Sequence, residues 1–197
     1  MSASKTMKVP RSIVFVGLMG AGKSCIGRRL AAQLGLEFVD ADAEIEAAAG
    51  CSIEDIFERH GESAFRDGER RVIARLLGQP AHILATGGGS FMDSQTRDTI
   101  RRRGISIWLR ADLDLLLKRT SRRNNRPLLK RGDPRKILEK LMVERHPVYG
   151  DADITVDSAD GPPEITVERV RAALREYLAA HPDIGAEAGR SAEGACP

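Results

Sequence analysis

The segment 17–24, which reads GLMGAGKS, has the residue types and the spacing of a loop that binds phosphate groups. It satisfies the pattern G-x-x-x-x-G-K-[ST] between an apolar run and a helical pattern, which is the context that this motif requires. Its glycines permit a tight turn whose backbone N–H groups point at a phosphate, and the following helix adds the positive end of its dipole. We expect Lys23 to reach the terminal phosphates and Ser24 to coordinate Mg²⁺. The segment therefore predicts a site for a nucleoside triphosphate.

Two carboxylates, Asp40 and Asp42, follow the next apolar segment at 38–39. If that tip is extended, both side chains point to the same face, because side chains alternate along a strand. One carboxylate could then hold Mg²⁺, and the other could accept a proton from an attacking hydroxyl. The alternative is structural: the same two residues could cap and begin the helix expected from Glu44.

A glycine run at 87–89 follows the third apolar segment. Three glycines let backbone amides approach a ligand closely, although an ordinary tight turn would also explain them. Arg66, Arg126 and Arg145 are candidate anion clamps, because guanidinium groups bind carboxylate and phosphate bidentately. In a chain this rich in arginine, each could equally lie on a solvated surface.

These candidate residues need a scaffold, and the chain alternates between strand and helix patterns throughout. Strands are expected at 13–16, 38–39, 82–86, 105–109 and 154–156. Helices are expected at 23–34, 44–49, 62–77, 93–103, 112–120 and 164–178, with others starting after Ser52, which fits a capping box with Asp55, and at Asp133-Pro134. This alternation predicts an α/β fold with a parallel sheet covered on both faces, and such sheets bind ligands at the carboxyl ends of their strands.

Composition limits the possible functions. The net charge of +3 is too small to argue for DNA binding, and 4% aromatic residues give little material for stacking on single-stranded nucleic acid. No apolar run is long enough for a membrane helix or a signal peptide, and the three cysteines show no metal-ligand spacing. We therefore expect a cytoplasmic protein with reduced thiols that binds neither nucleic acid nor membranes. The expected organisation is a flexible extension at 1–10, one domain at 11–180 with a mobile loop at about 121–132, and a disordered tail at 181–197.

Taken in order, the motifs resemble those of the shikimate kinase family. The resemblance extends over about 12–177 and consists of the phosphate loop followed by Asp40-Ala41-Asp42, Phe57, Phe65-Arg66, Gly87-Gly88-Gly89, Arg126-Pro127-Leu128-Leu129 and Arg145-His146-Pro147-Val148-Tyr149. Only the phosphate loop is specific by itself, whereas the complete ordered series is highly specific. The resemblance implies the three-layer P-loop kinase fold, with a five-stranded parallel sheet flanked by helices.

The resemblance also implies roles on the nucleotide side of the site. The ATP cradle would consist of Gly20, Ala21, Gly22, Lys23, Ser24 and Cys25. Lys23 would bridge phosphates, while Ser24 and Asp40 would serve Mg²⁺. Arg119 would lie against adenine, and Arg126, carried on a lid, would move onto the phosphoryl group in transfer.

On the substrate side, the resemblance implies that Asp42 binds the hydroxyl groups of shikimate and acts as a base. Arg66 and Arg145 would clamp the shikimate carboxylate, helped by the backbone at Gly88 and Gly89. The catalytic set would then be Lys23, Asp42 and Arg126.

These expectations describe an enzyme that phosphorylates the 3-hydroxyl of shikimate with ATP and Mg²⁺, and that acts as a monomer. One alternative is a related kinase for gluconate or a nucleotide, since gluconate would share the carboxylate clamp. The other is a kinase-like sensor domain that binds an effector without catalysis. A sensor is expected with a DNA-binding segment attached, and the residues before Arg11 are too few to form one.

Cys25 departs from the family pattern, in which this position is usually threonine. A thiol replaces a hydroxyl that could bond the α-phosphate, although the backbone N–H remains. Its place in the first helical turn beside Lys23 favours the thiolate and predicts a reactive cysteine. The alternative is that Cys25 turns inward as a small, inert core residue.

Overall fold

Five short apolar segments pair as one parallel sheet in the order β2-β3-β1-β4-β5. The computed structural model describes residue 7, residues 9–121 and residues 132–184. The strands are β1 (Ser12–Val16), β2 (Phe38–Asp40), β3 (Ile83–Ala85), β4 (Gly104–Arg110) and β5 (Ile154–Asp157). All of β1 and β3, and all but the last residue of β4, are buried, as expected for central strands covered on both faces.

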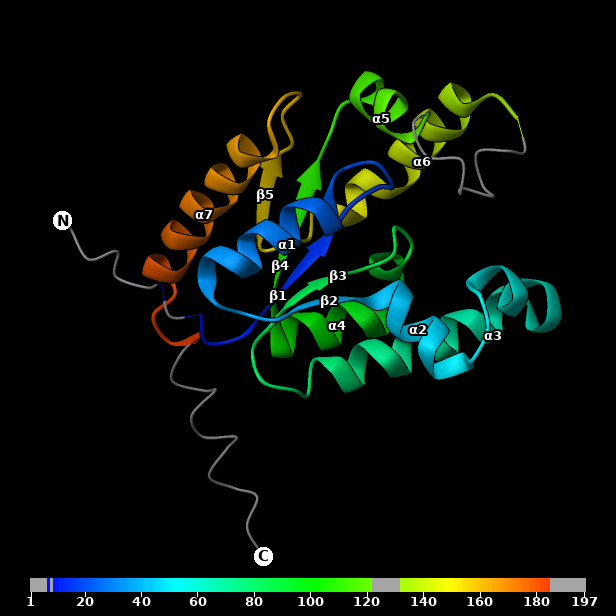
Figure 1. The fold of residues 1–197 in the computed structure, drawn as a ribbon, viewed down its shortest axis with the longest axis horizontal. Helices are drawn as coiled ribbons and strands as arrows, with labels where there is room; N and C mark the ends of the chain where they lie inside the picture. The colour runs from blue at the N-terminus through cyan, green and yellow to red at the C-terminus, as the bar shows by residue number, and fades with distance from the viewer. Residues whose placement is uncertain (1–6, 8, 122–131, 185–197) are drawn as a thin grey trace, which may run out of the picture.

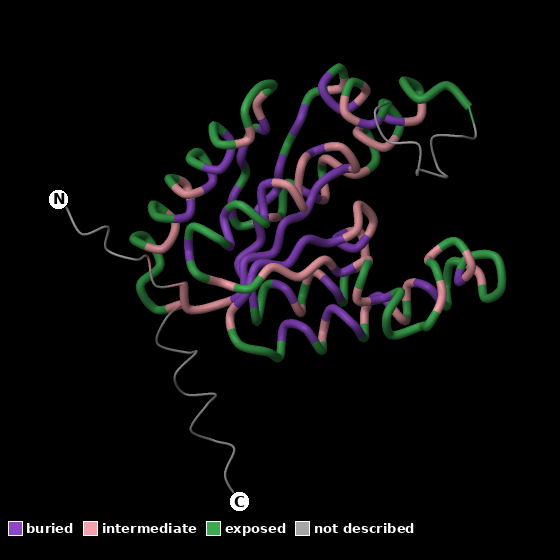
Figure 2. The backbone as a smooth tube through the Cα atoms, in the orientation of Figure 1, coloured by how far each residue is buried: buried purple, intermediate pink, exposed green. Residues whose placement is uncertain are grey.

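Helices form the two outer layers (Figure 1). They are α1 (Lys23–Leu34), α2 (Ala41–Ala49), α3 (Ile53–Leu76), α4 (Ser94–Arg103), α5 (Leu113–Thr120), α6 (Pro134–Tyr149) and α7 (Pro163–Ala180), with a short 3₁₀ turn at Ser90–Met92. Helices α1 and α7 pack together on one face of the sheet, and α4 with the second half of α3 lies on the other. The central strands of the sheet are buried, and the outward faces of the helices are exposed (Figure 2). The expected three-layer α/β fold is therefore confirmed.

Two helices differ from the sequence-based expectation. Helix α2 begins at Ala41 rather than Glu44, because the Asp40 side chain accepts a hydrogen bond from the Asp42 backbone N–H and caps the helix. Helix α3 is continuous from Ile53 to Leu76 except at Gly61, whose φ of 78° and ψ of 174° break the helical geometry. The two helices expected here therefore meet end to end at one glycine joint.

Part of the expected organisation falls beyond the described residues. This applies to 122–131 of the expected lid, which include Arg126, and to 185–197 of the expected tail. Met7 and Val9, which belong to the expected N-terminal extension, pack partly buried against the core. Among the described helices, none is both long and apolar enough to cross a membrane.

Candidate active site

The phosphate loop connects β1 to α1 and has a backbone that only glycine tolerates at several points. Gly17, Gly20 and Gly22 all have positive φ angles, and Gly22 is the N-cap of α1. A Cβ atom at Gly17 would lie 2.6 Å from the backbone oxygen of Leu109, so a side chain there is excluded sterically as well. The loop ends where α1 begins, which leaves the first N–H groups of that helix available to an anion.

Lys23, the first residue of α1, folds back over this loop. Its Nζ donates hydrogen bonds to the carbonyl oxygens of Gly17 at 2.7 Å and Leu18 at 3.0 Å. These contacts hold the ammonium group at the mouth of the loop, where a positive charge can meet the phosphates of a nucleotide.

Arg119, near the end of α5, braces the phosphate loop from the side. Its Nη1 donates to the carbonyl of Ala21 at 3.2 Å and to Ser158 Oγ at 2.8 Å, and its Nη2 donates to the carbonyl of Ala159 at 2.6 Å. The guanidinium therefore joins the phosphate loop to the segment after β5. Its expected contact with adenine stays a prediction.

Ser24 and Asp40 come together between the phosphate loop and the end of β2. The hydroxyl of Ser24 donates to Asp40 Oδ2 at 2.9 Å, while Asp40 Oδ1 accepts from the backbone N–H of Asp42 at 3.2 Å. Asp40 is thus a helix cap and a neighbour of the phosphate loop at once. Of the two readings of this pair, the structural one is confirmed: Asp40 caps α2, and Asp42 lies in the first turn of that helix.

Asp42 nevertheless faces the site and has an altered acidity. Burial raises its pKa from 3.8 to about 6, helped by the nearby charge of Asp40 and opposed by Lys23. A Cβ atom at Gly87 would lie 2.8 Å from Asp42 Oδ1, so the glycine gives this carboxylate room. A carboxylate with a pKa near neutrality suits a general base, because it can take up a proton and release it again at physiological pH.

Arg66 reaches the glycine run from α3 and is held there by a buried acid. Its Nη1 donates to Glu69 Oε2 at 2.7 Å, and Glu69 Oε1 accepts a hydrogen bond from Ser90 Oγ at 2.5 Å. A Cβ atom at Gly89 would lie 2.6 Å from Arg66 Nη2, so any side chain there would displace the guanidinium. Our reading of the sequence missed Glu69, although its spacing from Arg66 matches an ion pair on one helical face.

Arg145 and Tyr149, one turn apart on α6, both bind the backbone of Gly88. Arg145 Nη1 donates to the Gly88 carbonyl at 2.8 Å, and the buried Tyr149 hydroxyl donates to the same oxygen. Burial raises the pKa of Tyr149 above its usual value, so the hydroxyl keeps its proton and remains a donor. Tyr149 belongs to the motif quoted above, but no role was predicted for it.

The glycine run also lies close to the phosphate loop. A Cβ atom at Gly88 would lie 3.5 Å from the backbone nitrogen of Met19, 3.6 Å from the Gly17 carbonyl and 3.7 Å from Arg145 Nη1. Gly88 therefore lies near both the phosphate loop and Arg145. Arg126 lies outside the described residues, so its expected position stays a prediction.

Cys25 is half buried on α1 and is absent from the buried face of that helix. Its Sγ accepts a hydrogen bond from Arg29 Nη1 at 3.1 Å. The alternative in which Cys25 is a fully buried core residue therefore does not match the structure.

Comparisons with known proteins agree with this geometry. A family model described as shikimate kinase matches residues 19–175. A curated shikimate kinase of Paramagnetospirillum magneticum is 63% identical over 171 residues, which cover 87% of this chain and 88% of the relative. A shikimate kinase of Caulobacter vibrioides is 55% identical over 166 residues, which cover 84% of this chain and 83% of the relative.

Solved structures give the same result. A shikimate kinase from Acinetobacter baumannii in complex with shikimate superposes with a TM-score of 0.83 and 38% identity, covering 88% of this chain and 98% of the other. A gluconokinase from Sinorhizobium meliloti gives a TM-score of 0.57 at 20% identity, covering 89% of this chain and all of that one, which is a likeness of fold alone.

Proposed function

The chain belongs to the shikimate kinase family, and on that premise we propose that the site at the carboxyl edge of its sheet transfers the γ-phosphoryl group of ATP to the 3-hydroxyl of shikimate. The observation that carries this assignment is the proximity of the phosphate loop and the glycine run, where a Cβ atom placed on Gly88 would lie 3.5 Å from the backbone nitrogen of Met19. A nucleotide held on one side and a carboxylic acid held on the other would meet here. Phosphoryl transfer depends mainly on such positioning and on charge neutralisation.

On the nucleotide side, Lys23 stabilises the charge that spreads over the phosphoryl oxygens during transfer. Its hydrogen bonds to the Gly17 and Leu18 carbonyls fix the ammonium group before ATP arrives, so little reorganisation is needed. Arg119 holds the carbonyls of the same loop, and we assign the adenine ring to its neighbourhood. Arg126 would add a second positive charge from the lid.

Ser24 and Asp40 fit a magnesium ion by their chemistry. A hydroxyl and a carboxylate oxygen lie 2.9 Å apart beside the phosphate loop, and Mg²⁺ prefers oxygen ligands. Within the described ranges, no cluster of three or more His, Cys, Asp or Glu side chains could hold a metal without other ligands. This suits an ion bound by one or two protein groups together with the nucleotide phosphates, where it would neutralise their charge.

On the acceptor side, Asp42 receives the proton of the attacking hydroxyl. Its pKa of about 6 leaves it mostly ionised at neutral pH while it remains basic enough to accept a proton. Arg66 and Arg145 bind the carboxylate of shikimate, each held in place by a contact of its own, to Glu69 and to the Gly88 carbonyl. Two guanidinium groups on this side of the site favour a substrate that is an acid.

The two alternatives from the sequence are weaker. The gluconokinase likeness concerns the fold alone, while relatives at 52–63% identity are shikimate kinases. A sensor without catalysis would not need a carboxylate with a raised pKa beside a phosphate-loop lysine. We also propose that the enzyme acts as a monomer in the cytoplasm, where its free thiols Cys25 and Cys51 would stay reduced.

A coupled assay of ADP release tests this function. The purified enzyme is given MgATP with shikimate, gluconate, quinate or a nucleoside monophosphate in parallel. We expect release with shikimate to exceed the others by orders of magnitude, and Lys23→Met to abolish it while circular dichroism stays unchanged. Equal turnover of gluconate, or a folded Lys23→Met variant with a near-normal rate, would refute the assignment.

A further inference from the structure

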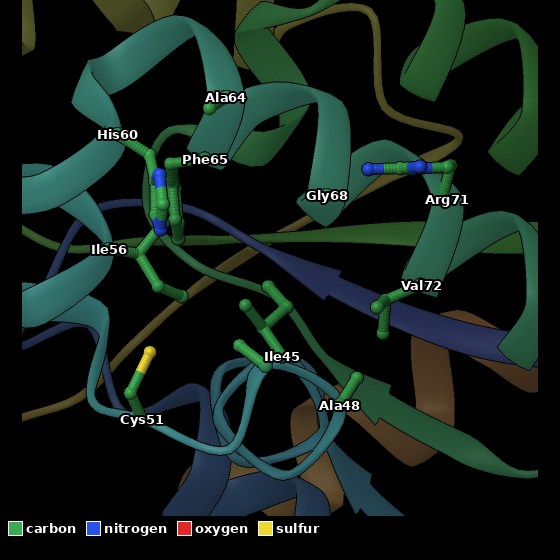
Figure 3. A pocket seen from close by; sticks show the side chains of 11 residues that line it. Ile45, Ala48, Cys51, Ile56, His60, Ala64, Phe65, Gly68, Arg71 and Val72 are labelled. Atoms are coloured by element: carbon green, nitrogen blue, oxygen red, sulfur yellow. The ribbon is translucent and has the colours of Figure 1, made fainter.

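A cavity of about 520 Å³ lies between α2 and α3, apart from the site described above. None of the residues assigned to ATP, Mg²⁺ or shikimate lines it. Its lining is mostly apolar, with Ile45, Ile56 and Phe65 as the largest apolar side chains (Figure 3). A concave, mostly apolar space of this size with a few polar groups is typical of small-molecule sites.

The polar groups of the cavity favour an anionic ligand. Arg71, His60 and Cys51 lie in its lining, and no acidic residue does. Arg71 is permanently charged, and its Nε donates to the Asp67 carbonyl at 3.3 Å, but it forms no ion pair with any described residue. Figure 3 shows its guanidinium extending over the side of the cavity at Gly68. A carboxylate could pair with it there.

Gly68 lies in the wall of the cavity, and the space in front of it is empty. A Cβ atom placed on this residue would meet no atom within 4 Å, and the residue lies inside α3 with helical geometry. Glycine weakens a helix interior relative to alanine, and neither backbone geometry nor crowding requires it here. A larger side chain at this position would extend into the cavity.

The wall of the cavity is connected to the substrate clamp. Phe65 lines the cavity, and the guanidinium carbon of Arg66 lies 5.1 Å from the centroid of the Phe65 ring. The same ring lies 4.6 Å from that of Phe57, across the joint at Gly61. The cavity is therefore walled by both segments of α3, and the ring of Phe65 also lies beside the guanidinium of Arg66. A ligand that displaces Phe65 would also displace the guanidinium.

We propose that this cavity is an inhibitory site for a small, largely apolar molecule with one carboxylate. Its apolar body would lie against Ile45, Ile56 and Phe65, and its carboxylate would pair with Arg71. Occupancy weakens shikimate binding through Phe65 and Arg66. The kinetic part of this inference rests on the proposed function, whereas ligand binding does not.

Cys51 gives a direct test, because Figure 3 shows its sulfur directed toward Ile56 within the cavity. In a Cys25→Thr, Cys196→Ser background, benzyl methanethiosulfonate attaches a benzylthio group to Cys51 as a mixed disulfide and releases methanesulfinate. Methyl methanethiosulfonate is the matched control, since its label is too small to fill the space. We expect the benzyl label to raise the KM for shikimate at least fivefold, the methyl label to leave it within twofold, and dithiothreitol to restore the parent value. An unchanged or lowered KM in fully benzyl-labelled enzyme would overturn the proposal.

A soluble probe separates this cavity from the substrate clamp, which also binds carboxylates. We expect 3-phenylpropanoate to inhibit and its amide to inhibit much less, with Arg71→Gln removing the difference. Gly68→Leu places a branched side chain inside the cavity and should weaken inhibition strongly, while Gly68→Ala, which adds one methyl group, should retain it. Equal inhibition of parent and Gly68→Leu would mean that the acid acts at Arg66 and Arg145, and the proposal would fail although the enzyme still phosphorylates shikimate. If Gly68→Leu does not fold, Arg71→Gln replaces it in the test. Equal inhibition of the parent and of Arg71→Gln by 3-phenylpropanoate would then refute the proposal.

Discussion

The hydroxyl of Tyr149 and the guanidinium of Arg145 donate to a single acceptor, the carbonyl oxygen of Gly88. A carbonyl oxygen has two lone pairs, so both donors can be accommodated together. If Arg145 turns toward a bound carboxylate, Tyr149 still holds the peptide group of Gly88. The tyrosine thereby keeps the glycine run in place while the arginine changes partner.

Tyr149→Phe should therefore raise the KM for shikimate about threefold to tenfold and leave the KM for ATP almost unchanged. The lost hydrogen bond frees the glycine run, but the aromatic ring still fills its buried position. Initial rates with each substrate varied in turn measure both constants. If the variant instead loses turnover at saturation with both KM values unchanged, Tyr149 does not position the substrate site.

Asp42→Asn should lower turnover about 10²–10⁴-fold, the range of general-base contributions, while ATP affinity stays close to that of the parent. The amide is nearly isosteric but cannot accept the hydroxyl proton. Single-turnover kinetics and nucleotide titration separate the two effects. Loss of ATP binding with turnover retained at saturation would assign Asp42 to the nucleotide instead.

The same substitution should stabilise the ligand-free, metal-free protein in a pH-dependent way. The pKa of Asp42 is raised on folding, from 3.8 to about 6, so the ionised form is disfavoured in the folded state. This penalty is absent below pH 3.8, grows as the pH rises toward about 6, and is complete above that, where it corresponds to about 3 kcal/mol. Urea unfolding of both proteins at several pH values, with EDTA present, should show the advantage of the variant growing over this window. A constant difference between pH 4 and 7 would contradict the burial of Asp42.

Arg66→Lys and Arg145→Lys should each raise the KM for shikimate strongly, because lysine keeps the charge but loses the planar fork. Shikimate with its carboxylate converted to an amide is the control substrate. The parent should handle the amide poorly and the variants should discriminate less between acid and amide. Arg71→Lys, at an arginine outside the site, serves as the matched control and should leave the KM for shikimate unchanged. Equal discrimination by parent and variants would exclude the clamp.

Cys25 should react with iodoacetamide faster than Cys51, and MgATP should slow the reaction. It lies half buried in the first turn of α1, directly after the phosphate loop, and Arg29 donates a hydrogen bond to its sulfur, so the thiol lies beside positive charge where bound phosphates would cover it. Peptide mass mapping over time, with and without MgATP, gives both rates. Slower labelling at Cys25 than at Cys51, or labelling that MgATP does not change, would show that the thiol is inert toward the nucleotide site.

The sequence predicted those parts of the site that depend on local patterns. Residues 17–24 form the expected loop because glycine spacing and a strand-to-helix junction are local properties. The start of α2 at Ala41, which places Asp42 in the first helical turn, was not predictable from local patterns. A short apolar segment does not show where the strand ends and the helix begins. The sheet was predictable from five apolar segments, but no local pattern showed the order of the strands within it.

Glu69 and Tyr149 escaped prediction for a different reason. A buried acid and a buried hydroxyl acquire their roles from partners far along the chain, here Ser90 and Gly88. No local pattern reveals such partners. Spacing offered a weak signal in both cases, since Glu69 follows Arg66 by three residues and Tyr149 follows Arg145 by four, and residues so spaced share a helical face.

The brace formed by Arg119 has a consequence for the order in which the protein matures during synthesis. The phosphate loop is translated early, but the groups that hold Arg119 against it, Ser158 and Ala159, come near the end of the chain. A nascent chain that stops before β5 therefore contains the motif without its support. We expect such incomplete chains to bind ATP poorly, so that nucleotide is consumed only after the segment that follows β5 has emerged from the ribosome.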